Sequence, residues 1–374
     1  MNILVTGANG FIGSNLCVFL NEAGYKNIIA ITRDDSEDDI LVKIAQADFI
    51  FHLAGVNRAD DDVEFRKGNA DLTALIVKQL IKFEKKIPVV LTSSIQAGLD
   101  NAYGVSKAEA EYALIEYKEK TGAEVSIYRL PNVFGKWCRP NYNSAVATFC
   151  YNTLNDLPIT IHNPDAVLNL VYIDDLCKNF VRLLDGSIVK SADCEISPTY
   201  RTTVGQVAKL LTRFKGSRNN LVSEKVGTEF TRALYSTYIS YLAPEQFAYS
   251  VSRHSDERGT FVEMLKTQDS GQLSFFTSHP GMTRGGHYHH TKTEKFLVIK
   301  GNASFKFRHI VTNASYELLV KGDESRIVET APGWSHDITN TGDGELIVML
   351  WANEIFDHSN PDTISFEVLE RWRN

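Results

Sequence analysis

Long apolar runs, paired cysteines and blocks of like charge are all missing from this chain of 374 residues. No apolar run reaches the roughly 20 residues that a membrane-spanning helix needs, and no signal peptide is recognisable at the start. The five cysteines are scattered without C-x-x-C spacing, and their odd number suits a reducing compartment. The net charge of −7, without a basic cluster, argues against a nucleic-acid partner. We therefore expect a cytoplasmic protein that does not insert into a membrane.

The length and a change of pattern near Pro244 predict two domains. A chain of this size is too long for one ordinary core. Up to residue 243, short apolar runs alternate with helical segments, which predicts an α/β domain with a doubly wound parallel sheet. From residue 244 to residue 374, short alternating runs separated by glycine and asparagine turns predict an all-β sandwich or barrel.

A glycine-rich turn follows the first apolar run directly. Ile3–Val5 predicts a buried strand, and Gly7, Gly10 and Gly13 follow before a helix that we expect from Ser14 to Ala23. A turn of this kind lets backbone N–H groups approach a pyrophosphate at the positive end of the helix. We expect a dinucleotide site at the following residues: Gly7, Asn9, Gly10, Phe11, Ile12 and Gly13, with Leu53 and Ala54 at the end of a later strand in 48–55.

The end of the second predicted strand, 27–31, indicates which nicotinamide cofactor is bound. A carboxylate there would hold the ribose hydroxyls of NAD, whereas Arg33 offers a guanidinium for the 2′-phosphate of NADP. We therefore predict NADPH. Asp34 and Asp35 follow directly, so the alternative is that Arg33 is a solvated loop cation.

A tyrosine and a lysine four residues apart predict acid–base chemistry. Tyr103 and Lys107 would lie on one face of a helix running to about Lys120, beyond a strand that leads into Ser93 and Ser94. A nearby ammonium favours the phenolate and would lower the pKa of the tyrosine. A serine hydroxyl at the strand end can hold a substrate oxygen.

Together these motifs resemble the extended short-chain dehydrogenase/reductase family of nucleotide-sugar enzymes over about residues 1–241. The resemblance is carried by TGANGFIG, HLAG, LTSS, YGVSK, RLPNVFG and VYIDD. It implies that Tyr103 exchanges the proton, that Lys107 tunes it and positions the nicotinamide ribose, and that Ser93 binds the substrate oxygen, with Ser94 as the alternative. Ala97 replaces a tyrosine that the family often has there, which favours simple ketone reduction over dehydration or 4-epimerisation.

A histidine cluster marks the second domain. His287 and His289 are two apart on a predicted strand and face the same side, Glu294 can return on the next strand, and His336 can come from a neighbouring one. Three imidazoles and a carboxylate form a plausible set of ligands for Zn²⁺ or another divalent metal. The spacing resembles the first motif of the cupins, jelly-roll barrel proteins. His290 could replace one ligand if the strand carries a bulge, and a cupin without metal is the other alternative.

The same region also resembles the cupin 3,5-epimerases and 3,4-ketoisomerases of 4-keto-6-deoxy sugars. The likeness is carried by residues 256–263, 274–278 and 284–287. It implies that His287 is the base that removes a proton next to the sugar ketone. Whether His287 is a base or a metal ligand stays open at this point.

A reductase followed by a cupin resembles the fused epimerase–reductases of bacterial capsular polysaccharide synthesis. The resemblance implies C3-epimerisation of a UDP-linked 4-keto-6-deoxy-L-N-acetylhexosamine in the cupin and NADPH-dependent reduction at C4 in the first domain. The implied product is UDP-N-acetyl-6-deoxy-L-talosamine, on the route to UDP-N-acetyl-L-fucosamine. A homodimer or higher homo-oligomer is also implied. The alternative is a ketone reductase whose cupin only dimerises or binds a ligand.

Overall fold

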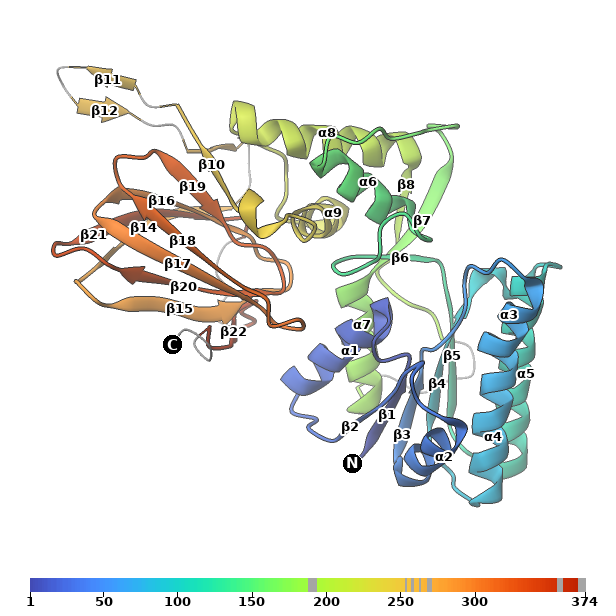
Figure 1. Ribbon diagram of the computed structural model, residues 1–374. Helices are drawn as coiled ribbons and strands as arrows, with labels where there is room; N and C mark the ends of the chain where they lie inside the picture. The colour runs from blue at the N-terminus through green and yellow to red at the C-terminus, as the bar shows by residue number, and fades with distance from the viewer. Residues whose placement is uncertain are drawn as a thin grey trace. The chain divides into compact units, whose positions relative to one another are not determined.

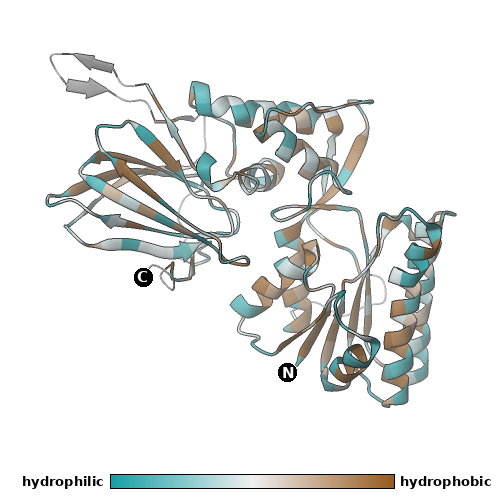
Figure 2. Ribbon diagram, viewed as in Figure 1, coloured by the Kyte–Doolittle hydropathy of each residue, from teal (hydrophilic) through white to brown (hydrophobic). Residues whose placement is uncertain are grey.

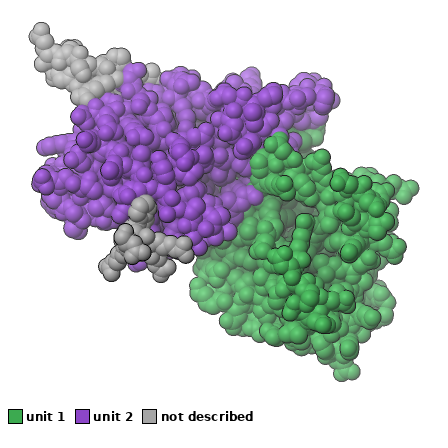
Figure 3. Space-filling view, in the orientation of Figure 1, with its two compact units in different colours: residues 1–134, 138–144, 167–202 green, residues 135–137, 145–166, 203–374 purple. Residues whose placement is uncertain are grey.

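The computed structural model describes residues 1–187, 194–252, 254–256, 259–261, 264–267, 271–354 and 359–368. The chain forms two compact units (Figure 3). The first unit comprises Met1–Phe134, Cys138–Ser144 and Val167–Thr202, and the second comprises Gly135–Trp137, Ala145–Ala166 and Thr203–Asn374. The expected boundary between residues 243 and 244 therefore lies inside the second unit. The division into domains 1–243 and 244–374 stays a prediction from the sequence patterns.

The first unit is built on five parallel strands in the order β2-β1-β3-β4-β5. This arrangement confirms the predicted Rossmann-like parallel sheet. The strands are short and mostly apolar because both faces of the sheet are covered, and Figure 2 shows them as hydrophobic. They are β1 (Ile3–Thr6), β2 (Ile28–Ile31), β3 (Phe49–His52), β4 (Val89–Ser94) and β5 (Val125–Leu130).

Helices pack on both faces of this sheet (Figure 1). On one face, Leu4 and Leu91 pack with Leu80 and Leu114 in a continuous buried cluster. On the other face, Phe180 contacts Phe51 at 5.5 Å between ring centroids. The first face is covered by α2 (Glu37–Gln46), α4 (Leu72–Lys82) and α5 (Ala102–Thr121), the second by α1 (Phe11–Glu22) and α7 (Ile173–Leu184). The short helices are α3 (Asp62–Arg66), the π-helix η1 (Lys67–Asp71) and the 3₁₀-helix η2 (Ile95–Gly98).

A small three-stranded sheet completes the first unit. Its order is β6-β7-β8, and β6 and β7 run parallel. The strands are β6 (Asn132–Phe134), β7 (Val167–Tyr172) and β8 (Tyr200–Thr203).

The second unit contains two five-stranded antiparallel sheets. The first consists of β10 (Ala248–Ser250), β19 (Arg326–Glu329), β16 (Glu294–Lys300), β21 (Leu346–Ala352) and β14 (Gln272–Ser278) in that order. The second consists of β18 (Ser315–Lys321), β17 (Asn302–His309), β20 (Trp334–Asn340), β15 (Thr283–Tyr288) and β22 (Ile364–Ser365). Two short pairs join β11 (His254–Asp256) to β12 (Gly259–Phe261) and β9 (Val222–Ser223) to β13 (Lys266–Thr267).

The two large sheets share a core of side chains. Phe296 of β16 contacts Phe305 of β17 at 5.7 Å between ring centroids, and it lies 6.1 Å from the ring of His336 on β20. Because side chains alternate along a strand, the same face of β16 also carries Glu294 and Val298. This all-β arrangement is compatible with the expected domain class, while its assignment as a cupin stays a prediction.

Helices also belong to the second unit. They are α6 (Ala145–Leu154), α8 (Val204–Asn220), α9 (Glu229–Ile239) and the 3₁₀-helix η3 (Pro244–Gln246). Arg218 of α8 pairs with the buried Glu329 of β19, and Lys295 of β16 donates to the same carboxylate at 3.1 Å. These ion pairs link a helix to two adjacent strands. None of the described helices is long and apolar enough to cross a membrane.

Candidate functional site

The turn between β1 and α1 has the geometry expected of a dinucleotide site. Gly7 has φ +66°, and a Cβ on it would lie 2.9 Å from Cα of Ala54. A Cβ on Gly13 would lie 2.2 Å from the carbonyl oxygen of Gly7. Both positions therefore require glycine. Because α1 begins after Gly10 without a side-chain cap and without an acidic residue in its first turn, its N–H groups remain available for a phosphate.

The predicted cofactor residues of two strand ends lie side by side. Oγ1 of Thr6 accepts hydrogen bonds from the backbone N–H groups of Leu53 at 3.1 Å and Ala54 at 3.0 Å. This joins the ends of β1 and β3. Asn9 lies in the glycine turn after β1, and Phe11 and Ile12 are the first two residues of α1.

His52, inside the apolar run of β3, is a structural residue. Its Nδ1 lies 2.7 Å from Thr6 Oγ1 and its Nε2 lies 2.8 Å from Thr73 Oγ1. Burial lowers its pKa to about 3, and Lys107 adds to this, so the ring is neutral at pH 7.

Arg33 is exposed just beyond β2. The carboxylate of Asp35 is engaged: it accepts from the backbone N–H of Thr32 at 2.8 Å and pairs with Lys43 at 2.5 Å. Asp35 is therefore engaged by Thr32 and Lys43, while the guanidinium of Arg33 is exposed beside it.

The structure brings Ser94, Tyr103 and Lys107 together. The Ser94 side chain acts on that of Tyr103, and Lys107 Nζ donates to the carbonyl oxygen of Thr92 at 2.7 Å. Burial raises the pKa of Tyr103, and the interaction with Ser94 opposes that rise. The lowering that we expected from Lys107 does not accompany these two effects. Burial also lowers the pKa of Lys107 to about 8, against the attraction of Glu111.

Ser93 is not brought to Tyr103. Successive side chains of a strand point to opposite faces, so Ser93 and Ser94 diverge. Ser93 Oγ donates to Glu111 Oε1 at 2.5 Å, and Arg129 holds the same carboxylate through Nε at 3.0 Å and Nη2 at 2.6 Å. The geometry therefore favours Ser94, the alternative, as the group that can meet a substrate oxygen.

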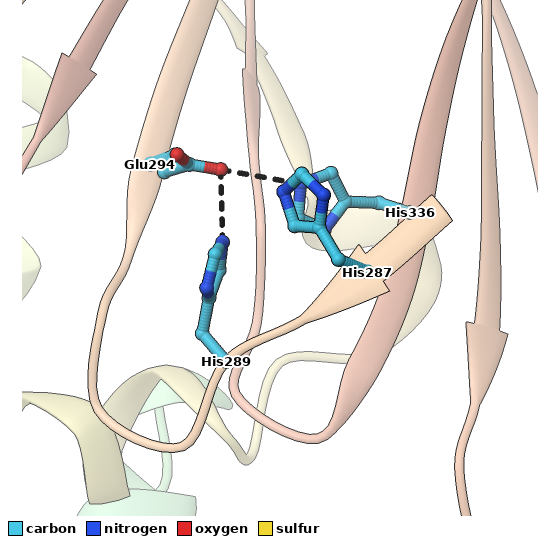
Figure 4. Close-up of side chains that lie close together, drawn as sticks. All are labelled: His287, His289, Glu294 and His336. Carbon is cyan, nitrogen blue, oxygen red and sulfur yellow. Dashed lines mark hydrogen bonds and ion pairs between the residues drawn. The ribbon is translucent and has the colours of Figure 1, made fainter. Parts of the chain in front are cut away.

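In the second unit, His287, His289, Glu294 and His336 form one cluster (Figure 4). Their candidate ligand atoms all lie within 4.8 Å of one another. Glu294 Oε2 is 3.2 Å from Nε2 of His289 and 3.2 Å from Nε2 of His336. His287 is half-buried and the other three are buried. His290 is not part of this group in the described chain, and its ring lies 5.6 Å from that of Tyr288.

Two members of the cluster, Glu294 and His287, are held in the protonation state that binds a cation. Burial would raise the pKa of Glu294, but His289 and His336 outweigh burial and hold it well below its usual range. Burial lowers the pKa of His287 to about 3, with His336 and His289 adding to the effect. The donor set of three imidazoles and one carboxylate therefore fits a divalent ion such as Zn²⁺.

Two residues that sequence reasoning missed support the cluster. The carboxylate of Asp362 accepts from the backbone N–H groups of His290, Thr291 and Lys292 at 2.6–2.8 Å, and its carbonyl oxygen accepts from His289 Nδ1. Lys292 Nζ lies 2.9 Å from Glu294 Oε1. Asp362 is some 70 positions from its partners, so no local pattern could have indicated it. Of the sugar-epimerase motif in 256–263, residues 257, 258, 262 and 263 lie outside the described residues.

Two family models match the chain. Residues 3–193 match the NAD dependent epimerase/dehydratase family, and residues 254–364 match the polysaccharide biosynthesis C-terminal domain.

Two relatives match along almost the whole length. The UDP-2-acetamido-2,6-beta-L-arabino-hexul-4-ose reductase of Pseudomonas aeruginosa is 54% identical over 99% of this chain and 100% of its own. The crystal structure of the capsular polysaccharide assembling protein CapF from Staphylococcus aureus is 40% identical, with a TM-score of 0.68, and covers 98% of this chain and 100% of its own. A UDP-glucuronic acid 4-epimerase from Bacillus cereus in complex with NAD shares the fold, at 20% identity and a TM-score of 0.52 over 58% of this chain and 83% of its own.

Proposed function

Because this chain belongs to the NAD dependent epimerase/dehydratase family, we propose that it is a bifunctional enzyme that epimerises and then reduces one UDP-linked 4-keto sugar. That it is an NAD(P)-dependent sugar-nucleotide enzyme follows from the family and its relatives. Reduction is assigned to the first unit and epimerisation to the second. The observation that carries the proposal is that each unit holds its own set of reactive side chains, Ser94–Tyr103–Lys107 in one and the histidine–glutamate cluster in the other.

The first site suits reduction of a ketone at C4. When bound, the nicotinamide cofactor supplies the hydride. Tyr103 donates its phenolic proton to the ketone oxygen, and the Ser94 hydroxyl holds that oxygen beside it. A pKa of Tyr103 raised by burial keeps the phenol protonated, which is the form that reduction consumes. The 4-ulose reductase of P. aeruginosa supports this choice of reaction.

NADPH is the proposed form of the cofactor. Arg33 can pair with a 2′-phosphate, while Asp35 is occupied by Lys43 and the Thr32 backbone. The backbone around Gly7, Gly10 and Gly13 would bind the pyrophosphate, and Lys107 would bind the nicotinamide ribose.

The second site suits removal of a proton next to the same ketone. His289, Glu294 and His336 would hold a divalent ion, and His287 either completes the set or acts as the base. When bound, such an ion stabilises negative charge on the keto oxygen of the substrate. A base then removes the C3 proton, and reprotonation on the other face inverts the carbon.

The order of the two steps follows from their energetics. Epimerisation breaks and forms like bonds, so it lies near equilibrium. Reduction at C4 removes the ketone that makes the C3 proton acidic. It thereby consumes the epimerised intermediate and drives the epimerisation towards product. We propose a UDP-4-keto-6-deoxy-L-N-acetylhexosamine as substrate and UDP-N-acetyl-6-deoxy-L-talosamine as product, in a cupin-bearing homodimer that serves capsule synthesis.

The test is to incubate the protein with candidate UDP-4-keto sugars in deuterated water, with and without NADPH. Without NADPH, we expect deuterium at C3 from the second site alone. With NADPH, we expect a C4 alcohol and consumption of the cofactor. Consumption of NADPH without deuterium at C3 would instead support the single-activity reductase.

A substitution in each site separates the two activities. Tyr103→Phe removes the phenolic proton, so we expect it to abolish NADPH oxidation and leave C3 exchange intact. Loss of both activities together would contradict two separate sites. His287→Asn is expected to abolish exchange; retention of metal in this variant would make His287 the base, and loss of metal would make it a ligand.

A further inference from the structure

One buried carboxylate beside the reductase site has no part in the proposed mechanism. Tyr103, Lys107 and Glu111 follow one another at four-residue intervals on α5, so they lie along one face of the helix. Glu111 is only 4% exposed. A carboxylate is seldom buried to this extent unless it is paired.

The partners of Glu111 come from two adjacent strands. Ser93 of β4 donates to Oε1, and Arg129 of β5 binds both carboxylate oxygens through Nε and Nη2. Ser93 and Arg129 are direct neighbours in the parallel register of β4 and β5. One carboxylate therefore fastens α5 to both strands.

This contact is one of two between neighbouring residues of β4 and successive turns of α5. The Thr92 carbonyl accepts from Lys107, and the Ser93 hydroxyl donates to Glu111. A shift of α5 along the strand would break both contacts at once. The Ser93–Glu111 contact uses no reactive group, so it can fix the register of α5 while Lys107 acts on the cofactor.

Glu111 also acts on Lys107 through its negative charge. Lys107 is buried against the Thr92 carbonyl, and its Nζ would lie 3.7 Å from a Cβ on Gly55, beside the Asn69 side chain. Burial disfavours the ammonium, and the attraction of Glu111 opposes burial. The other groups around Lys107 cannot do this: His52 is neutral, Asn69 is uncharged, Tyr103 is protonated, and Arg129 is a cation.

We propose that Glu111 is a positioning residue of the reductase: held by Ser93 and Arg129, it fixes the register of α5 against β4 and keeps Lys107 charged. This inference rests on the proposed role of Tyr103 and Lys107 in reduction. In this proposal Ser93 holds Glu111 and does not bind the substrate.

The test is the pH profile of NADPH oxidation by Glu111→Gln. The amide keeps the shape and can still accept from Ser93, but it removes the negative charge. Lys107 then loses its proton at lower pH, so we expect the alkaline fall in kcat to move down by about one pH unit. We expect kcat to fall roughly tenfold to a hundredfold at a fixed pH, with the KM for the sugar nucleotide little changed. The matched control is Glu116→Gln, on the exposed side of the same helix, which should leave the profile unchanged.

A second variant, Ser93→Ala, tests the register of α5 without changing the charge of Glu111. It also keeps the inference testable if Glu111→Gln does not fold. It keeps the Glu111–Arg129 pair, so we expect a lower kcat with an unshifted pH profile, and a far smaller loss than Ser94→Ala causes. A wild-type profile and kcat in Glu111→Gln would overturn the inference, as would an equal loss in Ser93→Ala and Ser94→Ala. If Glu111→Gln fails to bind NADPH, the comparison of kcat between Ser93→Ala and Ser94→Ala decides whether the inference holds. Absence of NADPH oxidation by the wild-type protein would instead refute the proposed function.

Discussion

At the residue scale, neighbouring side chains of one strand take different roles. Sequence reasoning could find the serine pair at the end of β4, because LTSS precedes YGVSK at a recognisable spacing. It could not choose between Ser93 and Ser94, because the choice depends on which face of the strand meets α5. The contact of Ser93 with Glu111 on α5 shows that orientation, and its two members are 18 positions apart.

The histidine cluster shows the same limit. The spacing of His287, His289 and Glu294 could be read from one segment, and His336 from a second motif. The residue that holds the loop behind them, Asp362, comes from a segment with no recognisable motif. Its carboxylate accepts from three backbone N–H groups, which any sequence supplies, and from the Thr291 hydroxyl.

Asp362→Asn tests that support. The amide loses the charge, and its NH₂ cannot accept from the backbone N–H groups at 290–292, so we expect His289 to lose its fixed orientation. Metal affinity should fall roughly tenfold to a hundredfold, as for other groups that orient a ligand from behind. The measurement is calorimetric titration of the metal-free protein with Zn²⁺, with Asp343→Asn on an exposed turn as control. Unchanged affinity in Asp362→Asn would contradict a role for this residue.

At the element scale, local patterns predicted long helices and buried strands best. The helix expected from near Tyr103 to Lys120 is α5, Ala102–Thr121, whose start is capped by Asn101 and whose end is marked by Gly122 at φ +71°. The helix α8 runs from Val204 to Asn220, and Arg218 in its last turn pairs with Glu329. That pair is a tertiary contact, which local sequence does not display.

The ion cluster under α8 yields a prediction about stability. Glu329 is 4% exposed and accepts from both Arg218 and Lys295, and Lys295 Nζ also donates to Tyr249 at 3.0 Å. Glu329→Gln leaves two buried cations without their counter-charge, so we expect the second unit to lose about 3–5 kcal/mol of unfolding free energy. Urea unfolding followed by tryptophan fluorescence measures this, because Trp137, Trp334 and Trp351 lie in that unit. Glu345→Gln, on the surface of the same unit, is the control, and equal stability of both variants would contradict a structural role for the cluster.

At the scale of the whole molecule, sequence families and compact units divide the chain at different places. A change of pattern near residue 244 was visible in the sequence, because the helical period gives way to alternation. The packing of α8 and α9 was not visible. Ser236 of α9 donates to the carbonyl oxygen of Thr291 at 2.8 Å, in the loop that carries the cluster residues, and Asn353 donates to the same oxygen at 3.2 Å. A chain cut after residue 243 would therefore leave these helices without the sheets that they pack on.

Chelation tests whether the two sites depend on each other. Tyr103 and Lys107 belong to the first unit and the four cluster residues to the second, with no shared side chain. Removing a bound metal should therefore abolish deuterium exchange at C3 but leave NADPH binding intact, along with reduction of a 4-ketone that already has the required C3 configuration. Deuterium exchange at C3 is measured by NMR and NADPH oxidation by absorbance, each before and after dialysis against a chelator. Added Zn²⁺ should restore the exchange. Loss of ketone reduction on the pre-epimerised substrate would mean that the second unit also serves hydride transfer.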